Sequence, residues 1–394
     1  MDEARCEQLP PRGAGDRADH RPRRRRDLRL STEKGETVTT RILIIGAGLT
    51  GLALANGLRH RGVDPVVVEQ APLITEAGWG IGLSERHCAA LDRLGLAERS
   101  QWGGHEITRN LMFDLRTGVV DKIRTDAQVM FSRSALQAGL LNGVADLVRT
   151  GIRPSSLVDH GDRVEVEFDD GGRENFDAVI GTDGIDSWIR RHVFHGPEAT
   201  YTGMAVLRFH VPTPDSLRTI SALGTGGDGA SLGYLLMHGG NTLQGMVFLP
   251  GPENNRRDHT PAQLAGLFPG ITGPLAVLAE QMRTDPPSYY VNINQAVVDT
   301  WSKGRVAIAG DAAHAMSPVL GQGAGAGFED AAILAELLTT PELSLPLALA
   351  SFERLRKPEA QSVQRLAHAT GQAFGAGAPP SKIYALDSTR PGGV

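Results

Sequence analysis

The sequence is short of cysteine, of long apolar runs and of positive charge. Its two cysteines, Cys6 and Cys88, form no Cys-x-x-Cys pair among the 394 residues, which excludes a disulfide framework and a dithiol redox centre. No apolar run approaches the roughly 20 residues that span a bilayer. The formal net charge of −5 lacks the basic excess that favours nucleic acids or acidic membranes. We therefore expect a cytoplasmic protein that binds neither nucleic acid nor a membrane.

The two ends of the chain lack a folding pattern. Residues 1–40 have few large apolar residues, no periodicity and the basic run "RPRRRR". Such a composition buries too little apolar surface to fold, and no apolar segment follows to make a secretory signal. We expect residues 1–40 to be a disordered or mis-assigned extension, with a bacterial start at Val38. We expect residues 375–394 to be a flexible C-terminal tail.

Glycine is abundant, with 48 residues, and the first glycine-rich loop has the pattern of a dinucleotide site. In "RILIIGAGLTG" an apolar strand leads into Gly46, Gly48 and Gly51. These glycines permit a tight turn, close approach of a pyrophosphate and close helix–strand packing. Glu69 ends the next predicted strand about 20 residues on, where a carboxylate accepts hydrogen bonds from a ribose. Because a carboxylate there disfavours a 2′-phosphate, the loop predicts a site for FAD or NAD rather than NADP.

The middle of the chain interrupts this pattern. From about residue 199 to 293, short alternating strands with Gly and Pro breaks predict an antiparallel sheet. Regular βα alternation returns at "RVAIAGDAAH", whose strand joins the first sheet, so the loop after it grips the far end of the same nucleotide. The predicted fold is α/β: a Rossmann-like domain with a parallel sheet and helices, interrupted by an antiparallel β-rich substrate domain. The nucleotide domain comprises 41–108, 128–198 and 294–374, and the substrate domain 109–127 and 199–293.

Three motifs follow one another in the order of a known family. They are the GxGxxG loop, a DG motif in "GTDGIDSWIRR" and a GD motif in "AGDAAHAMSPVLGQGAGAGFEDA". Over about residues 41–372 the chain resembles the single-component, FAD-dependent aromatic-ring hydroxylases, the p-hydroxybenzoate hydroxylase-like flavoprotein monooxygenases. The last loop departs from the family pattern, since Gly325 stands where the family often has Asn. We expect this difference to remove a side-chain contact with flavin or substrate and to loosen the loop.

The resemblance implies which residues bind FAD. The first loop and Glu69 would hold the ADP half, Arg133 would lie near the ribityl–phosphate region, and Asp311 would bind the ribityl chain. Residues 321–325 would present backbone N–H groups to the pyrimidine edge of the flavin, and Asp183 is a candidate for both FAD and NAD(P)H. The implied cofactor-binding residues are Gly46, Gly48, Leu49, Thr50, Gly51, Glu69, Gln70, Gly82, Arg133, Asp183, Gly184, Gly310, Asp311, Gly321, Gln322, Gly323, Ala324 and Gly325.

The resemblance also implies the reaction. NAD(P)H, as NADPH or NADH, would reduce the bound FAD, and O2 would add to give a flavin hydroperoxide. Its terminal oxygen would hydroxylate or epoxidise an electron-rich, aromatic or polyketide-type small molecule of secondary metabolism. No metal is required, and the protein would be a monomer or a homodimer. The candidates for the substrate side are Arg208, His210, Tyr234, His238 and Pro318.

Other functions remain open at this point. A flavoenzyme of the same fold could instead be a Baeyer–Villiger oxygenase or an enoyl or isoprenoid reductase. A flavin-dependent halogenase is disfavoured, because the four tryptophans are isolated and form no Trp-x-Trp-x-Ile-Pro segment. A non-catalytic flavin-binding accessory protein is the alternative outside enzymes.

Overall fold

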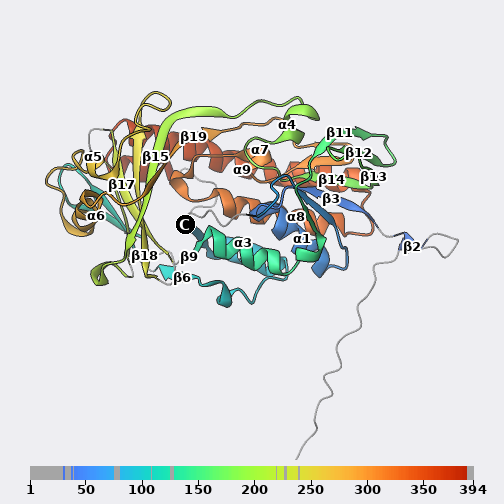
Figure 1. Ribbon diagram of the computed structural model, residues 1–394, viewed down its shortest axis with the longest axis horizontal. Coiled ribbons are helices and arrows are strands. Elements are labelled where there is room, and N and C mark those ends of the chain that lie inside the picture. The colour runs from blue at the N-terminus through green and yellow to red at the C-terminus, as the bar shows by residue number, and fades with distance from the viewer. Residues whose placement is uncertain are drawn as a thin grey trace, which may run out of the picture.

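The computed structural model describes residues 30–31, 37–38, 40–74, 80–107, 109–124, 128–218, 220–225, 229–237 and 240–387 (Figure 1). Most of the predicted N-terminal extension lies outside the described residues; within it, β1 (Leu30–Ser31) pairs antiparallel with β2 (Thr37–Val38). Two sheets stand at opposite ends of the molecule, and long helices run between them (Figure 1). In the described part of the chain, no helix is both long and apolar enough to cross a membrane.

The first sheet is the expected nucleotide-binding one. Its six strands lie in the order β10-β4-β3-β14-β21-β20, and all neighbours are parallel except the β20 edge. Every residue of β3 and β14 is buried, as expected for strands covered on both faces. The bounds are β3 (Ile42–Ile45), β4 (Val66–Glu69), β10 (Val148–Thr150), β14 (Ala178–Gly181), β20 (Ser302–Lys303) and β21 (Val306–Ile308).

Helices cover this sheet and share one core with it. The helix after the first glycine loop, α1, packs closely on α8, because Gly57 lies where a Cβ would be 3.0 Å from the Cβ of Ala335. A small antiparallel sheet, β11-β12-β13, lies beside it. The bounds are α1 (Leu49–His60), α2 (Glu85–Arg93), α3 (Arg133–Asn142), β11 (Pro154–Asp159), β12 (Val164–Phe168), β13 (Arg173–Phe176), α4 (Trp188–His192), α7 (Asp311–His314), α8 (Gly323–Leu338) and α9 (Leu345–Gly375).

The second sheet is the predicted β-rich interruption. Its seven strands lie in the order β19-β15-β18-β17-β16-β7-β8, antiparallel except for the β16–β7 pair. The α/β fold with an antiparallel insertion is therefore confirmed. The bounds are β7 (Arg109–Asp114), β8 (Val120–Arg124), β15 (Thr200–Pro212), β16 (Ile220–Thr225), β17 (Ser231–Met237), β18 (Thr242–Pro250), α5 (Pro261–Ala265), α6 (Gly273–Arg283) and β19 (Ser288–Gln295).

The second sheet has two different faces, because successive side chains of a strand point to opposite sides. On the outer face, Leu207 and Phe209 share a core with Leu275 of α6. On the inner face, Val206 and Phe248 share a core with residues of α9 and of the C-terminal helix α10 (Pro380–Asp387). The inner face therefore points toward the nucleotide-binding half. A three-stranded sheet joins the halves: β5 (Gly80–Ser84), β9 (Gln128–Ser132) and β6 (His105–Ile107).

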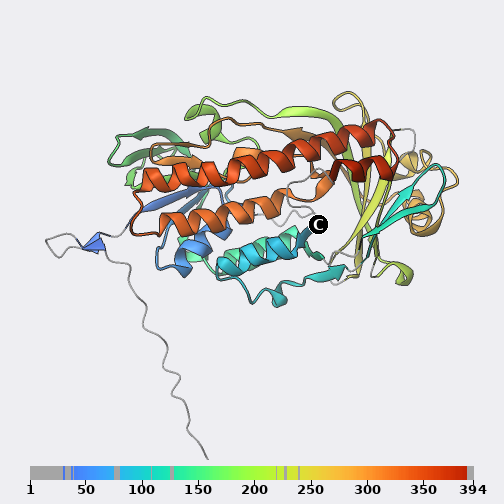
Figure 2. The same cartoon turned by 180° about the vertical axis from the view of Figure 1, so that it is seen from behind.

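The C-terminal part of the chain is more ordered than the sequence predicts. Helix α9 has 31 residues and runs along most of the molecule, as the long orange-red helix of Figure 2 shows. Instead of a flexible tail from residue 375, a further helix α10 (Pro380–Asp387) follows it. The side chain of Ile383 is only 7% exposed and packs in the inner-face core, which explains why this segment folds back. Residues 388–394 lie outside the described residues.

Candidate active site

The first glycine loop has the close contacts that its pattern predicts. Gly46 adopts φ 106°, and a Cβ there would lie 2.5 Å from the carbonyl oxygen of Thr182. A Cβ on Gly51 would lie 2.0 Å from the carbonyl oxygen of Gly46. Gly48 differs, because a Cβ there would meet nothing within 4 Å. Gly46 and Gly51 thus pack the loop, whereas Gly48 leaves its backbone open to a ligand.

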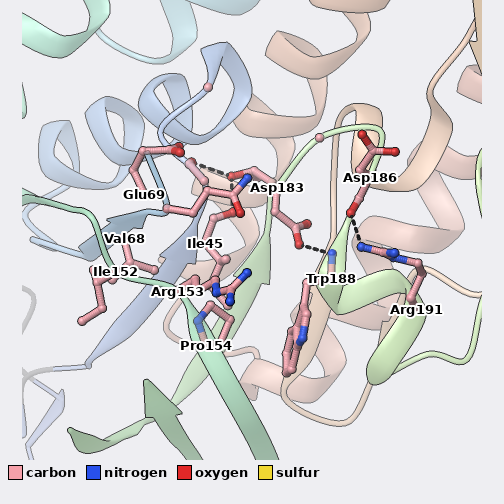
Figure 3. Close-up of a pocket in the computed structure, with 15 residues that line it drawn as sticks. Ile45, Val68, Glu69, Ile152, Arg153, Pro154, Asp183, Asp186, Trp188 and Arg191 are labelled. Atoms are coloured by element: carbon pink, nitrogen blue, oxygen red, sulfur yellow. Dashed lines mark hydrogen bonds between the residues drawn. The ribbon is translucent and has the colours of Figure 1, made fainter. Parts of the chain in front are cut away.

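A cavity of about 270 Å³ opens beside this loop, at the carboxyl ends of β3, β4 and β14 (Figure 3). Arg153 and Pro154 form part of its wall, with Trp188 and Arg191 of α4. Trp188 and Arg191 belong to the segment of the DG motif, whereas no sequence signal pointed to Arg153 and Pro154, because their segment reaches the cavity only through the fold. Of the predicted cofactor-binding residues, this cavity brings together Gly46, Gly48, Glu69, Gln70, Asp183 and Gly184.

Glu69 is fixed at the edge of this cavity by the backbone. Its Oε2 accepts a hydrogen bond from the N–H of Ala47 at 2.9 Å, and its Oε1 accepts one from the N–H of Ala71 at 2.9 Å. A carboxylate oxygen can accept more than one hydrogen bond. Glu69 can therefore still receive the hydroxyls of a ribose, and the two N–H donors hold it in place for them.

Asp183 and Arg190 fix the DG loop. The carboxylate of Asp183 accepts a hydrogen bond from the Ser187 hydroxyl at 2.6 Å. It accepts another from the N–H of Trp188 at 2.7 Å, which Figure 3 shows. Burial raises the pKa of Asp183, although these hydrogen bonds act in the opposite direction. The fully buried Arg190 donates to the carbonyl oxygen of Ala312 at 3.1 Å and so ties the DG loop to the GD loop. Asp183 therefore serves first to cap α4.

Thr50 joins the first glycine loop to the GD loop. A Cβ on Gly310, which has φ 61°, would lie 2.5 Å from the Thr50 Oγ1, and a Cβ on Gly327 of α8 would lie 2.3 Å from it. Leu49, at the start of α1, is buried. Asp311 begins α7 with an exposed side chain, and its Oδ1 lies 3.9 Å from the Cβ position of Gly323. The GD carboxylate thus stands beside the N-terminus of α8.

A buried cluster of charged side chains holds the GD loop in place, and the sequence pattern did not reveal this cluster. Asp330 of α8 accepts hydrogen bonds from the Gly310 N–H at 2.9 Å, from His314 Nε2 at 2.5 Å and from Arg356 Nε at 2.9 Å. Burial alone would raise the pKa of Asp330, but His314 and Arg356 hold it below its ordinary value of 3.8. Arg356 also pairs with Glu329 at 2.8 Å. The cluster therefore fixes the backbone that presents Asp311.

His87 explains the departure from the family pattern at residue 325. Its ring is 2% exposed and packs on α8, so that a Cβ on Gly325 would lie 2.3 Å from ring atoms. His87 belongs to α2, where it completes a capping box with Ser84. The expectation of a looser loop is therefore wrong at this position, because Gly325 is buried inside a regular helix. The volume of a side chain at 325 is taken by the imidazole of residue 87.

A second cavity, of about 190 Å³, lies between the inner face and the loop after the GD motif. Pro318, Leu320 and Gly321 form one wall, and Met246 and Phe248 of β18 form part of the other. Gly82 also lines this cavity, so it lies nearer the substrate sheet than the adenosine end. Elsewhere, Gln322 precedes α8, Ala324 lies in its first turn, and Arg133 begins α3 after its capping residue Ser132.

The candidates for the substrate side lie in different places. Arg208 is half-buried on the inner face, where burial lowers its pKa to about 10, but it is not among the residues that line the second cavity. His210 is exposed further along the same strand. Tyr234 lines the second cavity, and its buried side chain shares the outer-face core with Phe209. His238 lies outside the described residues.

The nucleotide cleft lies at the carboxyl ends of parallel strands, and the GD loop connects it to the second cavity. These two features together define a dinucleotide-binding flavoprotein. The chain matches the family described as FAD binding domain over residues 39–367. A 3-amino-4-hydroxybenzoate 2-monooxygenase of Streptomyces platensis is 31% identical over 361 residues, covering 85% of this chain and 88% of that one. The chain therefore belongs to the FAD-dependent monooxygenases. The resemblance inferred from the motifs is confirmed, and so are FAD as the cofactor and NAD(P)H and O2 as co-substrates.

Two further comparisons show how widely this fold is used. A 2-heptyl-3-hydroxy-4(1H)-quinolone synthase of Pseudomonas aeruginosa is 29% identical over 346 residues, covering 84% of this chain and 88% of that one. The crystal structure of HpxO from Klebsiella pneumoniae with FAD and uric acid has a TM-score of 0.76 at 23% identity, covering 89% of this chain and 96% of that one. At that identity the likeness concerns the fold.

Proposed function

We propose that this protein is a single-component hydroxylase whose substrate, a small electron-rich aromatic molecule, occupies the cavity under the inner face. The observation that carries the proposal is the position of one loop. Pro318 and Gly321 line this cavity, and the same loop leads into the start of α8 beside Asp311. The segment expected to hold the ring end of FAD is thus one wall of the cavity, and the β-sheet is the opposite wall.

The residues of the nucleotide cleft fit the ADP half of FAD. Gly48 leaves its backbone open, Glu69 has free acceptor capacity, and the start of α1 directs N–H groups at a pyrophosphate. Asp311 would hold the ribityl chain, with Arg133 near the phosphate end. The first turn of α8 would supply N–H donors and a positive dipole end to the flavin ring. Bound FAD supplies the redox chemistry, with NAD(P)H as electron donor and O2 as oxygen source.

The protein's own contribution is to orient the substrate and to keep water out. The second cavity is walled mainly by apolar side chains, among them Leu223, Leu235 and Phe248. The relatives support an aromatic substrate, since their names refer to an aminohydroxybenzoate and to a quinolone. We further propose the domain limits 41–108, 128–198 and 294–374 for FAD and 109–127 and 199–293 for substrate. We also propose that the enzyme works in the cytoplasm as a monomer or homodimer.

The proposal is tested in two stages on the purified full chain. An absorbance spectrum with the visible flavin bands, before or after addition of FAD, is expected first. NADH and NADPH oxidation is then followed with a panel of phenols, aminophenols and quinolones, and at least one is expected to accelerate oxidation and to gain one oxygen by mass spectrometry. A colourless protein that FAD cannot reconstitute would overturn the proposal. Product formation without O2 would instead indicate a reductase.

A further inference from the structure

The second cavity contains a fixed carboxamide on its sheet wall. Asn110 of β7 and Ser221 of β16 are opposite each other in the parallel pair of strands, and both line the cavity. The Ser221 hydroxyl, whose residue is 4% exposed, donates a hydrogen bond to Asn110 Oδ1. Since Leu223 lies two residues after Ser221 on the inner face, this pair points toward the Pro318 loop.

This hydrogen bond determines what Asn110 can offer to a ligand. A carboxamide has one acceptor oxygen and two N–H donors. Because the oxygen already accepts from Ser221, the group that remains for a ligand is the NH2. A turned-over amide would have to donate to the Ser221 hydroxyl, which can also accept, so the direction of this bond is that of the arrangement in the structure. In that arrangement the wall of the cavity presents an NH2 donor.

The rest of the described lining is uncharged. Thioethers of Met112, Met130 and Met246 and the amide of Gln128 accompany the apolar walls, and none of the described lining residues is acidic or basic. A carboxylate taken out of water against these described lining residues loses its hydration without gaining a cationic partner among them. A carbonyl oxygen loses much less and can accept from the Asn110 NH2. Polarizable sulfur also suits the faces and edges of aromatic rings.

We propose that this cavity selects uncharged aromatic carbonyl compounds, with the carbonyl oxygen on the NH2 of Asn110, over aromatic carboxylates. Asn110 determines specificity, and Ser221 is a positioning residue that orients its amide. This inference rests on the proposed function, because it takes the cavity as the place of the substrate. The names of two relatives refer to an aminohydroxybenzoate and to a quinolone, which leaves open whether this protein binds a carboxylate or an uncharged carbonyl compound. The inference narrows the substrate class to the uncharged carbonyl compound.

The test measures binding to the FAD-loaded enzyme, by perturbation of the flavin absorbance, for three matched probes. They are 4(1H)-quinolone, the same ring with a 2-carboxylate, and quinoline, which lacks the carbonyl. The quinolone is expected to bind at least about tenfold more tightly than its carboxylate, and Asn110→Ala to weaken quinolone binding about tenfold, the size of one buried hydrogen bond. The affinity for quinoline should not respond to this variant.

Two more variants separate specificity from folding. Ser221→Ala is expected to weaken quinolone binding by a smaller factor, and Ser221→Thr, which keeps the hydroxyl, to restore it. Asn175→Ala, at an exposed position of the small distal sheet, is the matched control and should change nothing. Equal or tighter binding of the carboxylate, or an Asn110→Ala variant that binds quinolone as the wild type does, would overturn the inference. Either result leaves the hydroxylase proposal standing, whereas a failure to take up FAD overturns the hydroxylase proposal and this inference with it.

Discussion

The Nε2 of His314 lies 2.5 Å from Oδ2 of Asp330, and both side chains are completely buried. The same oxygen accepts the N–H of Gly310, and the other oxygen accepts from Arg356. One carboxylate on α8 thus joins the GD loop to α9. Buried residues that line neither of the two cavities therefore hold the backbone that presents Asp311.

Asp330→Asn should weaken FAD binding and lower stability together. The amide cannot accept from all three donors, and breaking a buried charged cluster costs about 3–5 kcal/mol. We expect a fall of about 3 kcal/mol in the free energy of unfolding of the FAD-free protein, and in addition a higher Kd for FAD. Urea unfolding and titration of FAD fluorescence measure the two. Glu342→Gln, at an exposed site, is the control. An unchanged Kd would show that the cluster does not position the GD loop.

The contribution of Asp330 should depend on pH in a defined direction. Its pKa in the folded protein is held below the ordinary 3.8, so its contribution is fully present above pH 3.8 and is lost as the pH falls through the lower folded value. The difference in unfolding free energy between wild type and Asp330→Asn should therefore be largest near neutral pH and shrink below pH 4. A difference that grows in acid would contradict the assignment.

Tyr234→Phe should leave catalysis intact. Among the described residues the Tyr234 hydroxyl is buried without a hydrogen-bond partner, and burial raises its pKa. Removing an unsatisfied buried hydroxyl should raise the free energy of unfolding by about 1 kcal/mol. KM and kcat for the best substrate should stay at wild-type values. A tenfold loss of kcat would instead place the hydroxyl at the cavity and reverse our assignment to the outer face.

Residues 87 and 325 should be energetically coupled. Gly325→Asn alone should cost about 3 kcal/mol through overpacking against the imidazole, and His87→Ala alone should cost less. The double variant should lose less free energy of unfolding than the two single variants added together, by at least about 1 kcal/mol, because the new amide at position 325 then occupies the space that the imidazole has left. The measurement is a double-mutant cycle of unfolding free energies. Strict additivity would mean that the two positions do not compete for one volume.

Glu69→Gln should raise the Kd for FAD about 10- to 100-fold, since a charged acceptor is lost and the new NH2 faces one of two backbone N–H donors. Fluorescence of released FAD measures the effect. Glu98→Gln on the exposed surface should bind FAD as the wild type does. If the two variants bind FAD equally, Glu69 serves only to hold the turn.

The sequence alone was sufficient to predict the structure where that structure depends on residues close together in the chain. The strand, turn and helix around Gly46, Gly48 and Gly51 were predicted correctly, because all three are local. Asp330 and Arg356 were not found, since their partnership arises only when α8 and α9 pack side by side. Tyr234 lines the second cavity, but the sequence could not show that its side chain packs in the outer-face core, because alternation tells which residues share a face and not which face meets the flavin half. The fold of α10 was missed because Ile383 gains its burial from a distant sheet.

Helix α9 limits how this enzyme can be recombined with its relatives. At one end Glu353 accepts from the N–H of Ser302 at the edge of the nucleotide sheet, and at the other Gln372 donates to the carbonyl oxygen of Thr202 and Phe374 packs on Phe248. A chimera that imports only residues 199–293 would pair a foreign sheet with the native end of this rod. A transferred sheet should be accompanied by the part of α9 that packs on it. The segment to exchange in order to change the substrate preference therefore includes the last turns of α9 as well as the insertion.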